Sequence, residues 1–527
     1  MAQQNVLIAG EWRAADASSF FQSENPATKA ALPDEYPVSN WADCDAALNS
    51  ASEAFQQLLT TPDRGAKIAD FLEGFATALE ARKDSLVEMA NAETGLPTAP
   101  RLGDVEFPRT TGQLRQAAGA ARSGSWALPT IDTAAGIRSV YGPLGPVCVF
   151  GPNNFPFAFN GAAGGDFAAA VAAGNPVIAK ANSSHPGTTR ILAEAAHEAA
   201  QSTGMPAGMV QLIYRTAHED GEKLVSDPRV GATGYTGSRN AGLKLKGAAD
   251  GAGKPIYLEL SSVNPVVFLP GAIAERGAAL AEEFAGSCLM GAGQFCTNPG
   301  LVVLLASDAT EAFIKDVADR FGAAPVGTLL SRSVESSLSQ NLATLAGAGA
   351  EVLVGNGPGD DSRFSVANTL LRVSGKQFIA DPEMMQTEAF GNASLLVVAD
   401  SIDEVCKVLA ALEGNLTGCV YSDTNGSDDA AYDQVAPILR QKVGRLLNDK
   451  MPTGVAVSAA MNHGGPYPAT SHPGFTAVGI PGAILRFGML QCYDAVRPNR
   501  LPAILQDSNP TGAWRLVDGA WTQGELS

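Results

Sequence analysis

Cys296 lies in a segment that is a poor environment for a buried cysteine. A cysteine is most often a small buried hydrophobic residue, and we expect this of the other six. The segment GAGQFCTNPG surrounds Cys296 with glycine and polar residues, namely Gly291, Gly293, Gln294, Thr297 and Asn298. A polar, glycine-rich turn better suits a reactive thiolate, which is the nucleophilic form of cysteine. We therefore predict that Cys296 is a nucleophile.

Two other polar side chains stand directly after apolar runs. Asn154 lies in GPNNFPFAFN, after the run at 145–151, and Glu259 lies at the end of the run KPIYLEL at 254–260. Taken alone, Asn154 fits the cap of a helix N-terminus and Glu259 fits a solvated carboxylate at a strand end. Both positions also fit a site at the carboxyl edge of a parallel sheet, where ligands bind.

The elements that must position these residues alternate between strand and helix. From about 144 to 265, four helical segments separate five apolar runs, at 145–151, 175–181, 208–215, 230–237 and 254–260. This alternation is typical of an open parallel sheet. A second alternating region follows to about 480, with strand candidates at 264–270, 299–307, 393–400 and 418–422.

The N-terminal part predicts two further elements. Residues 5–14 fit a short β-hairpin. Apolar residues recur at helical spacing within 63–91, where Ile68, Phe71, Leu72, Phe75 and Leu79 would share one helix face.

Five segments, in the same order, resemble motifs of the aldehyde dehydrogenase superfamily. They are Asn154-Phe155-Pro156, Thr236-Gly237-Ser238, Glu259-Leu260-Ser261-Ser262, Gly293-Gln294-Phe295-Cys296 and Glu388-Ala389-Phe390-Gly391. One such motif is weak, whereas five in order are specific. The resemblance covers nearly the whole chain and is closest to the branch of α-ketoglutarate semialdehyde and fatty aldehyde dehydrogenases.

The resemblance implies oxidation of an aldehyde to a carboxylate. Cys296 would attack the aldehyde carbon to form a thiohemiacetal, which hydride transfer to a nicotinamide converts into a thioester. The Asn154 amide and the Cys296 backbone N–H would stabilise the oxyanion, and Glu259 would activate the water that hydrolyses the thioester. His463 would be a turn histidine on its own, but in the NADP-linked long-chain branch a histidine in this region approaches the cysteine and lowers its pKa.

The chain departs from the family pattern at three places. Asn153 replaces the usual tryptophan, Ser261 and Ser262 replace two glycines, and the segment at 463–466 replaces a Pro-Phe-Gly-Gly region. These changes indicate an outlying branch of the superfamily.

Three residues bear on the choice of nicotinamide cofactor. By resemblance, Lys180 holds the adenosine ribose, and NAD-preferring members often carry a glutamate three residues later. Here that residue is Ser183, and Arg215 ends the next run at the same edge of the sheet. Arg215 alone fits a surface salt bridge equally well, but the three residues together would hold a phosphate. We predict that NADP is preferred and that NAD is usable.

The resemblance also assigns the rest of the cofactor site. Thr236, Gly237 and Ser238 would pass beside the pyrophosphate, Glu388 would bind the nicotinamide ribose, and Phe390 would pack against the ring. Without the resemblance, Glu388 and Phe390 would be an ordinary loop residue and core residue.

Composition excludes several other classes of protein. The chain has 45% apolar residues, 17% charged residues and a formal net charge of −18. It is therefore expected to be globular and to bind neither nucleic acid nor an anionic membrane surface. Seven scattered cysteines without a CxxC pair predict no disulfide framework, no metal site and a cytoplasmic location. We find neither a signal peptide nor an apolar run long enough to span a membrane.

We predict an α/β protein with the aldehyde dehydrogenase fold. A Rossmann-like cofactor domain would comprise 1–130 and 144–265, and an α/β catalytic domain 266–475. A small β-arm, formed by 131–143 and 482–527, would bridge subunits of the homodimer or homotetramer that the resemblance implies.

The predicted function is NADP-dependent oxidation of an aldehyde, with α-ketoglutarate semialdehyde (2,5-dioxopentanoate) as the first substrate and 2-oxoglutarate as its product. A long-chain fatty aldehyde is the alternative substrate. A cofactor-independent thiol hydrolase or acyltransferase, and a non-catalytic structural relative, are the alternative classes.

Overall fold

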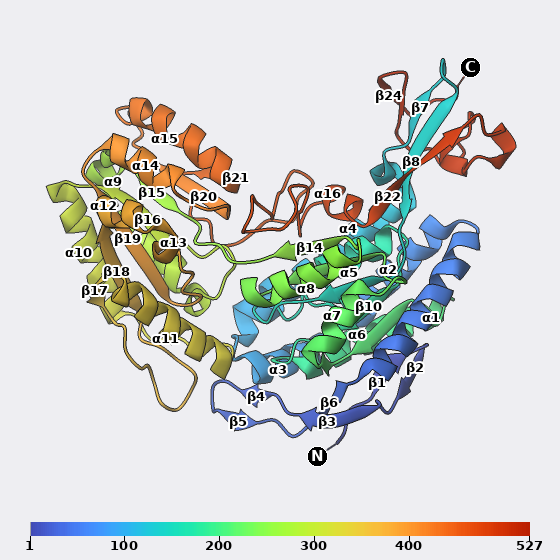
Figure 1. Ribbon diagram of the computed structural model, residues 1–527, viewed down its shortest axis with the longest axis horizontal. Helices are drawn as coiled ribbons and strands as arrows, with labels where there is room; N and C mark the ends of the chain where they lie inside the picture. The colour runs from blue at the N-terminus through green and yellow to red at the C-terminus, as the bar shows by residue number, and fades with distance from the viewer. Residues whose placement is uncertain (1, 527) are drawn as a thin grey trace.

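The computed structural model describes residues 2–526 as two α/β halves and a projecting β-arm (Figure 1). Each half is built on a seven-stranded sheet, and the arm on a five-stranded sheet. In Figure 1 the blue-to-green first half lies below the arm, and the yellow-to-orange second half lies to the left. The predicted α/β architecture with parallel sheets is confirmed.

The first sheet has its five predicted strands side by side and parallel, because each is a short run of buried apolar residues. The order is β14 (Ile256–Glu259), β13 (Ala232–Thr236), β9 (Val147–Phe150), β10 (Val177–Lys180) and β11 (Val210–Ile213). The chain moves from β9 to β11 in one direction and then returns to the other side of β9. This reversal places a ligand crevice at the carboxyl ends of β9 and β13.

The predicted N-terminal hairpin extends this sheet in the antiparallel direction. Its strands are β1 (Val6–Ile8), which pairs with β11, and β2 (Glu11–Arg13). Two smaller ribbons flank it, one of β12 (Arg215–Thr216), β6 (Tyr36–Ser39) and β3 (Ala17–Phe21), the other of β4 (Glu24–Asn25) and β5 (Ala30–Ala31).

Eight α-helices belong to the first half of the described chain. They are α1 (Trp41–Thr60), α2 (Arg64–Glu80), α3 (Lys83–Thr94), α4 (Phe107–Ser123), α5 (Gly165–Ala172), α6 (Pro186–Ser202), α7 (His218–Ser226) and α8 (Arg239–Gly251). The apolar spacing predicted within 63–91 is that of α2, whose five marked side chains are all buried. The four helices α5 to α8 connect the parallel strands, as the alternation predicts.

The second half repeats this plan with its own core. Its strand order is β17 (Glu351–Val354), β18 (Thr369–Ser374), β19 (Ala393–Ala399), β16 (Leu301–Leu305), β15 (Val266–Phe268), β20 (Asn415–Tyr421) and β21 (Val443–Asn448). Only β17 runs antiparallel to its neighbour among these seven strands. Its helices are α9 (Pro270–Leu289), α10 (Asp308–Ala323), α11 (Arg332–Gly347), α12 (Gly375–Ala380), α13 (Pro382–Met385), α14 (Ile402–Ala410) and α15 (Asp429–Lys442).

The arm joins two segments that are far apart in the sequence. Its strands are β22 (Gly488–Asp494), β8 (Ile137–Pro143), β7 (Thr130–Asp132), β23 (Arg515–Val517) and β24 (Ala520–Thr522), and the short helix α16 (Gly482–Leu485) precedes it. The predicted pairing of these segments is seen, whereas their role between subunits stays a prediction. None of the helices in residues 2–526 is long and apolar enough to cross a membrane.

Candidate active site

The turn that carries Cys296 follows α9 and has an unusual backbone. Gly291, Ala292 and Gly293 all have positive φ, at 57°, 55° and 67°. A side chain at Gly293 would place its Cβ 2.0 Å from the carbonyl oxygen of Gly391, so only glycine fits there. Three left-handed residues in succession turn the chain so that Cys296 is half-buried at the wall of a cleft.

The side chain of Asn264 holds the turn that carries Cys296. Its Nδ2 donates to the Cys296 carbonyl oxygen at 2.9 Å, and its Oδ1 accepts from the Ser262 and Thr417 hydroxyls, each at 2.9 Å. Asn264 has a positive φ of 46°, a conformation that asparagine tolerates better than most residues. Sequence reasoning missed Asn264, although it lies two residues after the motif Glu259-Leu260-Ser261-Ser262.

His463 lies between the thiol and the carboxylate of the site. Its Nε2 is 3.3 Å from Sγ of Cys296 and 3.0 Å from Oε1 of Glu259. Both His463 and Glu259 are only 2% exposed. The structure therefore brings together three residues that are up to 204 positions apart in the chain.

The segment after β21 carries His463 to this position. Its residues 469–471 run antiparallel beside β14, because Leu260 N–H donates to the Ala469 carbonyl at 2.8 Å and Ser471 N–H to the Leu258 carbonyl at 3.1 Å. The His463 N–H also donates to the Thr476 hydroxyl at 2.9 Å. Glu259 itself ends β14, as the sequence predicts.

The charges around His463 determine its protonation. Burial opposes a charged imidazole, but the nearby Glu259 and Cys296 more than offset this and raise the pKa of His463 to about 10. The ring is therefore an imidazolium at neutral pH. A single proton on Nε2 faces both Sγ of Cys296 and Oε1 of Glu259, so the positive charge lies within hydrogen-bond distance of the sulfur.

Asn154 lies in an irregular loop after β9, and no helix of residues 2–526 begins there, so it is not a helix cap. Its Nδ2 donates to the Gln294 carbonyl at 3.1 Å, two residues before the cysteine. The Asn154 carbonyl accepts from Arg101 at 2.9 Å, and Arg101 is paired with the buried Glu106. Glu106 also accepts from two backbone N–H groups of the same loop. The Arg101–Glu106 pair therefore holds the loop that carries the Asn154 side-chain amide.

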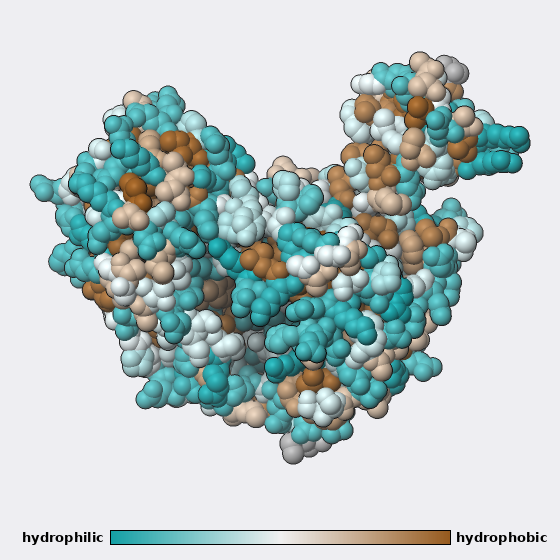
Figure 2. Space-filling model, in the orientation of Figure 1, coloured by the Kyte–Doolittle hydropathy of each residue, from teal (hydrophilic) through white to brown (hydrophobic). Residues whose placement is uncertain are grey.

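A cleft of about 860 Å³ opens beside Cys296 between the two halves. Figure 2 shows a largely hydrophilic face that is hollowed where the halves meet. Eight predicted site residues line the cleft: Asn154, Thr236, Gly237, Ser238, Glu259, Cys296, Glu388 and Phe390. His463 lies behind it, in contact with two of them.

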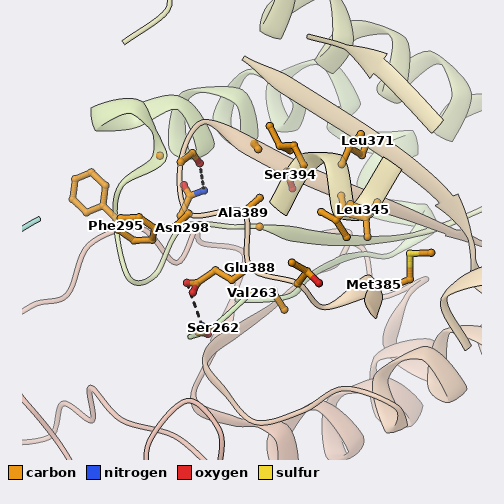
Figure 3. A pocket seen from close by; sticks show the side chains of 18 residues that line it. Ser262, Val263, Phe295, Asn298, Leu345, Leu371, Met385, Glu388, Ala389 and Ser394 are labelled. Atoms are coloured by element: carbon orange, nitrogen blue, oxygen red, sulfur yellow. Dashed lines mark hydrogen bonds between the residues drawn. The ribbon is translucent and has the colours of Figure 1, made fainter. Parts of the chain in front are cut away.

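The cleft wall around Glu388 belongs to the second half (Figure 3). Figure 3 shows Glu388 turned toward Ser262, whose N–H it accepts at 3.3 Å. Burial is the main cause that raises the pKa of Glu388 to about 7. Residues 387–391 also line a small neighbouring cavity. Its wall includes the apolar side chains of Leu345, Leu371 and Met385.

Lys180, Ser183 and Arg215 do not line this cleft. Lys180 ends β10 and Ser183 lies in the turn that follows. Burial lowers the pKa of Lys180 to about 8, and the positive charge of Arg215 adds to this effect. The two cations are therefore near each other. The sequence predicted that Arg215 ends β11, but Arg215 instead begins β12 in the small sheet with β6 and β3, because β11 ends at Ile213.

The two halves contribute different parts of the site. The first half has a crevice at the carboxyl edge of an open sheet, and the second half carries the thiol beside an imidazolium. Such a crevice suits a dinucleotide, and its backbone at Thr236–Ser238 leads into the N-terminus of α8, where a pyrophosphate is favoured. The class of protein that combines these features is the thiol-dependent dehydrogenase.

Sequence comparison is consistent with this class. The profile of the "Aldehyde dehydrogenase family" matches residues 12–449, so the chain belongs to the aldehyde dehydrogenase family. It is an oxidoreductase that oxidises aldehydes to carboxylates with a nicotinamide dinucleotide. The membership favours this reaction over a cofactor-independent hydrolase and over a non-catalytic relative. His463 lies beyond the matched residues.

Two relatives match over nearly the whole chain. Alpha-ketoglutaric semialdehyde dehydrogenase 2 of Azospirillum brasilense is 41% identical over 495 residues, which cover 92% of this chain and 93% of the relative. Alpha-ketoglutaric semialdehyde dehydrogenase of Acinetobacter baylyi is 36% identical over 490 residues, covering 91% of each.

Solved structures confirm the fold. Aldehyde dehydrogenase C of Pseudomonas syringae, in complex with NAD⁺ and octanal, has a TM-score of 0.80 and 19% identity, covering 94% of this chain and 98% of its own. Lactaldehyde dehydrogenase of Escherichia coli has a TM-score of 0.80 and 20% identity, covering 93% and 99%.

Proposed function

We propose that the chain oxidises α-ketoglutarate semialdehyde (2,5-dioxopentanoate) to 2-oxoglutarate and prefers NADP. The observation that carries the substrate is the 41% identity, over 92% of the chain, with a relative of that name. The group of Cys296, His463 and Glu259, in which an imidazolium lies between the sulfur and the carboxylate, supports the chemistry that this substrate requires.

In the first step, the Cys296 thiolate attacks the aldehyde carbon and forms a thiohemiacetal. The developing oxyanion is stabilised by the Asn154 amide and by the Cys296 backbone N–H, each of which contributes about 3–4 kcal/mol in comparable sites. Nδ2 of Asn154 donates one N–H to the Gln294 carbonyl, and its second N–H can donate to the oxyanion. A nicotinamide bound in the cleft supplies the acceptor for the hydride.

In the second step, Glu259 prepares water to hydrolyse the Cys296 thioester. Its Oε1 faces His463, whereas Oε2 has no hydrogen-bond partner within residues 2–526. This free carboxylate oxygen can accept the proton of the attacking water. His463 holds the Glu259 carboxylate in position through Oε1, and it balances the negative charge as the thiolate leaves.

The cofactor would contact both halves. Thr236, Gly237 and Ser238 would lie along the pyrophosphate, and Glu388 and Phe390 would hold the nicotinamide riboside from the other side. The neighbouring cations Lys180 and Arg215, with the neutral Ser183, support a site for the 2′-phosphate of NADP. Neither cation forms an ion pair with a carboxylate of residues 2–526, so both are available to a phosphate.

The arm supports assembly of more than one chain. Five large apolar side chains project from it, at 37–57% exposure: Ile137, Met489, Leu490, Trp514 and Trp521. Some of the brown residues in Figure 2 gather on this arm. A homodimer or homotetramer would cover these side chains. All seven cysteines are free thiols, which supports a cytoplasmic location.

The test is a comparison of substrates and cofactors with the purified enzyme. We expect kcat/KM for α-ketoglutarate semialdehyde to exceed that for straight-chain alkanals of any length, and NADP to give the lower KM of the two cofactors. A maximum at a long alkanal would instead identify a fatty aldehyde dehydrogenase. A lower KM for NAD would refute the cofactor proposal.

A further inference from the structure

Arg109 is a cation in the aromatic wall beside the active site. It lies in the first turn of α4, and its Nε donates to Oε1 of Gln113 at 3.0 Å. Its guanidinium lies over two rings, 5.1 Å from the centroid of Phe159 and 5.8 Å from that of Phe155. The side chain is therefore held in one orientation by contacts with its flat faces and its Nε.

The charge of Arg109 is not compensated inside the protein. No carboxylate of residues 2–526 forms an ion pair with it, and its Nη2 is buried without a hydrogen-bond partner in that range. Burial accordingly lowers its pKa from the usual arginine value, while the charges of Cys296 and Glu106 act in the opposite direction. Arg109 is half-buried, and a buried guanidinium nitrogen without a hydrogen-bond partner is costly unless an anion compensates its charge.

Two other arginines near the site are already occupied. Arg101 is paired with Glu106 and donates to the Asn154 carbonyl at 2.9 Å. Arg445 donates to the carbonyls of Pro452 at 2.7 Å and Gly454 at 3.2 Å, and so holds a loop. Arg101 and Arg445 each have a buried Nε without a partner, but their terminal nitrogens are hydrogen-bonded. The terminal nitrogens of Arg109 have no hydrogen-bond partner within residues 2–526, and only its Nε has one.

Aromatic rings connect Arg109 to the reacting groups. The Phe155 ring is 5.7 Å from that of Phe295, which directly precedes Cys296. The Phe159 ring is 5.7 Å from the His463 ring. Phe155 and Phe159 belong to one apolar cluster with residues of the loop after β21, such as Val457 and Met461. The methylene groups of a short substrate can pack on these rings between the cation and the thiol.

We propose that Arg109 binds the carboxylate of the substrate and selects aldehydes that carry a carboxylate at the other end of a short chain. The inference rests on the proposed function and adds the residue that recognises its 2-oxo acid group. The Arg109 guanidinium, which has no carboxylate partner within residues 2–526, can donate to a carboxylate oxygen, and its planar shape can present a second N–H to the same group. Neutral aldehydes of the same length make no such contact.

The experiment replaces Arg109 and compares two substrates of equal length. In Arg109→Gln, kcat/KM for α-ketoglutarate semialdehyde should fall about 10- to 100-fold, the range for losing a hydrogen bond to a charged group. For pentanal it should change by less than about two-fold, because pentanal lacks the carboxylate. Arg115→Gln is the matched control, since Arg115 is in the same helix but is exposed and paired with Glu80; it should leave both values unchanged.

The outcomes separate this inference from the proposed function. If the wild-type enzyme does not prefer the semialdehyde to pentanal, the proposed substrate is wrong, and the inference falls with it. If the wild type has the preference and Arg109→Gln keeps it, the proposed substrate stands and the inference is overturned.

A binding measurement covers the case in which Arg109→Gln is inactive. The product 2-oxoglutarate should slow the alkylation of wild-type Cys296 by iodoacetamide, and it should protect the Arg109→Gln thiol much less. Equal protection of both proteins would overturn the inference. Arg109→Lys, which keeps the charge without the planar donor pair, should recover part of the protection.

Discussion

The two ends of the cofactor site differ in how their charges are balanced. At the reaction end, the imidazolium of His463 lies between the Cys296 thiol and the Glu259 carboxylate, all supplied by the chain. At the end that we propose for the adenosine, Lys180 and Arg215 are neighbouring cations that repel each other. The reaction end is thus organised by the chain itself, whereas the proposed adenosine end has an excess positive charge that a bound anion would compensate.

The largest effect is expected when the thiol of Cys296 is removed from the reaction end. Cys296→Ala should lower kcat by at least about 10⁴-fold, as expected for loss of a covalent nucleophile. NADP binding, measured by quenching of NADPH fluorescence, should be unchanged because the adenosine end does not depend on the thiol.

Cys288→Ala is the matched control for this variant. Cys288 lies eight residues earlier, is fully buried and packs in the core of the second half, so its replacement should leave turnover within a few-fold of the wild type. Turnover near the wild-type value in Cys296→Ala would show that another group is the nucleophile.

A smaller effect is expected at the adenosine end. Arg215→Ala should raise the KM for NADP about 10-fold and leave the KM for NAD nearly unchanged, because one charge-assisted contact to the 2′-phosphate is lost. The ratio of the two KM values is the measurement. Equal increases for both cofactors would mean that Arg215 contacts a part that NAD and NADP share.

The smallest effect is a dependence on pH at the same end. Lys180 has a pKa of about 8, so it is protonated below that pH and becomes neutral as the pH rises through it. A neutral amine binds phosphate less well, so the KM for NADP should rise a few-fold between pH 7 and pH 9.

Two controls test whether the pH dependence comes from Lys180. The KM for NAD, which lacks the 2′-phosphate, should rise less over the same range. In Lys180→Arg the side chain stays charged, and the rise should disappear. A rise that is the same for both cofactors, or that persists in Lys180→Arg, would assign the titration to a different group.

The sequence predicted the parts of the site that depend on local order. The buried runs that end at Phe150, Thr236 and Glu259 form adjacent parallel strands, so their ends meet at one edge. The polar, glycine-rich turn predicted that Cys296 does not pack in the core, and the structure has it half-buried at the wall of the cleft. The five apolar residues predicted for one helix face are all buried in α2.

The parts that the sequence did not predict depend on contacts between distant segments. Asn264 holds the cysteine turn through a side chain and a left-handed backbone that no local pattern marks. Arg109 lies 187 positions before Cys296 in the chain, and its unpaired charge is visible only once its neighbours are known. An arginine in a helix normally forms an ion pair with a carboxylate at the surface. The sequence alone does not show when such a carboxylate is missing.

His463 is an intermediate case. The sequence suggested it only by resemblance, and it lies in a loop without a regular pattern. Its position depends on residues 469–471 pairing with β14, a contact between segments more than 200 positions apart. Only the structure shows that one nitrogen faces both the thiol and the carboxylate.

The most direct test of this account is the rate at which iodoacetamide alkylates Cys296 as a function of pH. With His463 as an imidazolium up to pH 10 or so, the wild-type thiol should react rapidly at neutral pH, and His463→Gln should react about 10- to 100-fold more slowly there. The variant should recover at alkaline pH, where an ordinary thiol with a pKa of about 8.5 ionises without help. His472→Gln, at a histidine whose ring packs edge-to-face with that of Tyr257 instead, should behave as the wild type. Identical pH profiles for the wild type and His463→Gln would contradict the claim that the imidazolium activates the nucleophile.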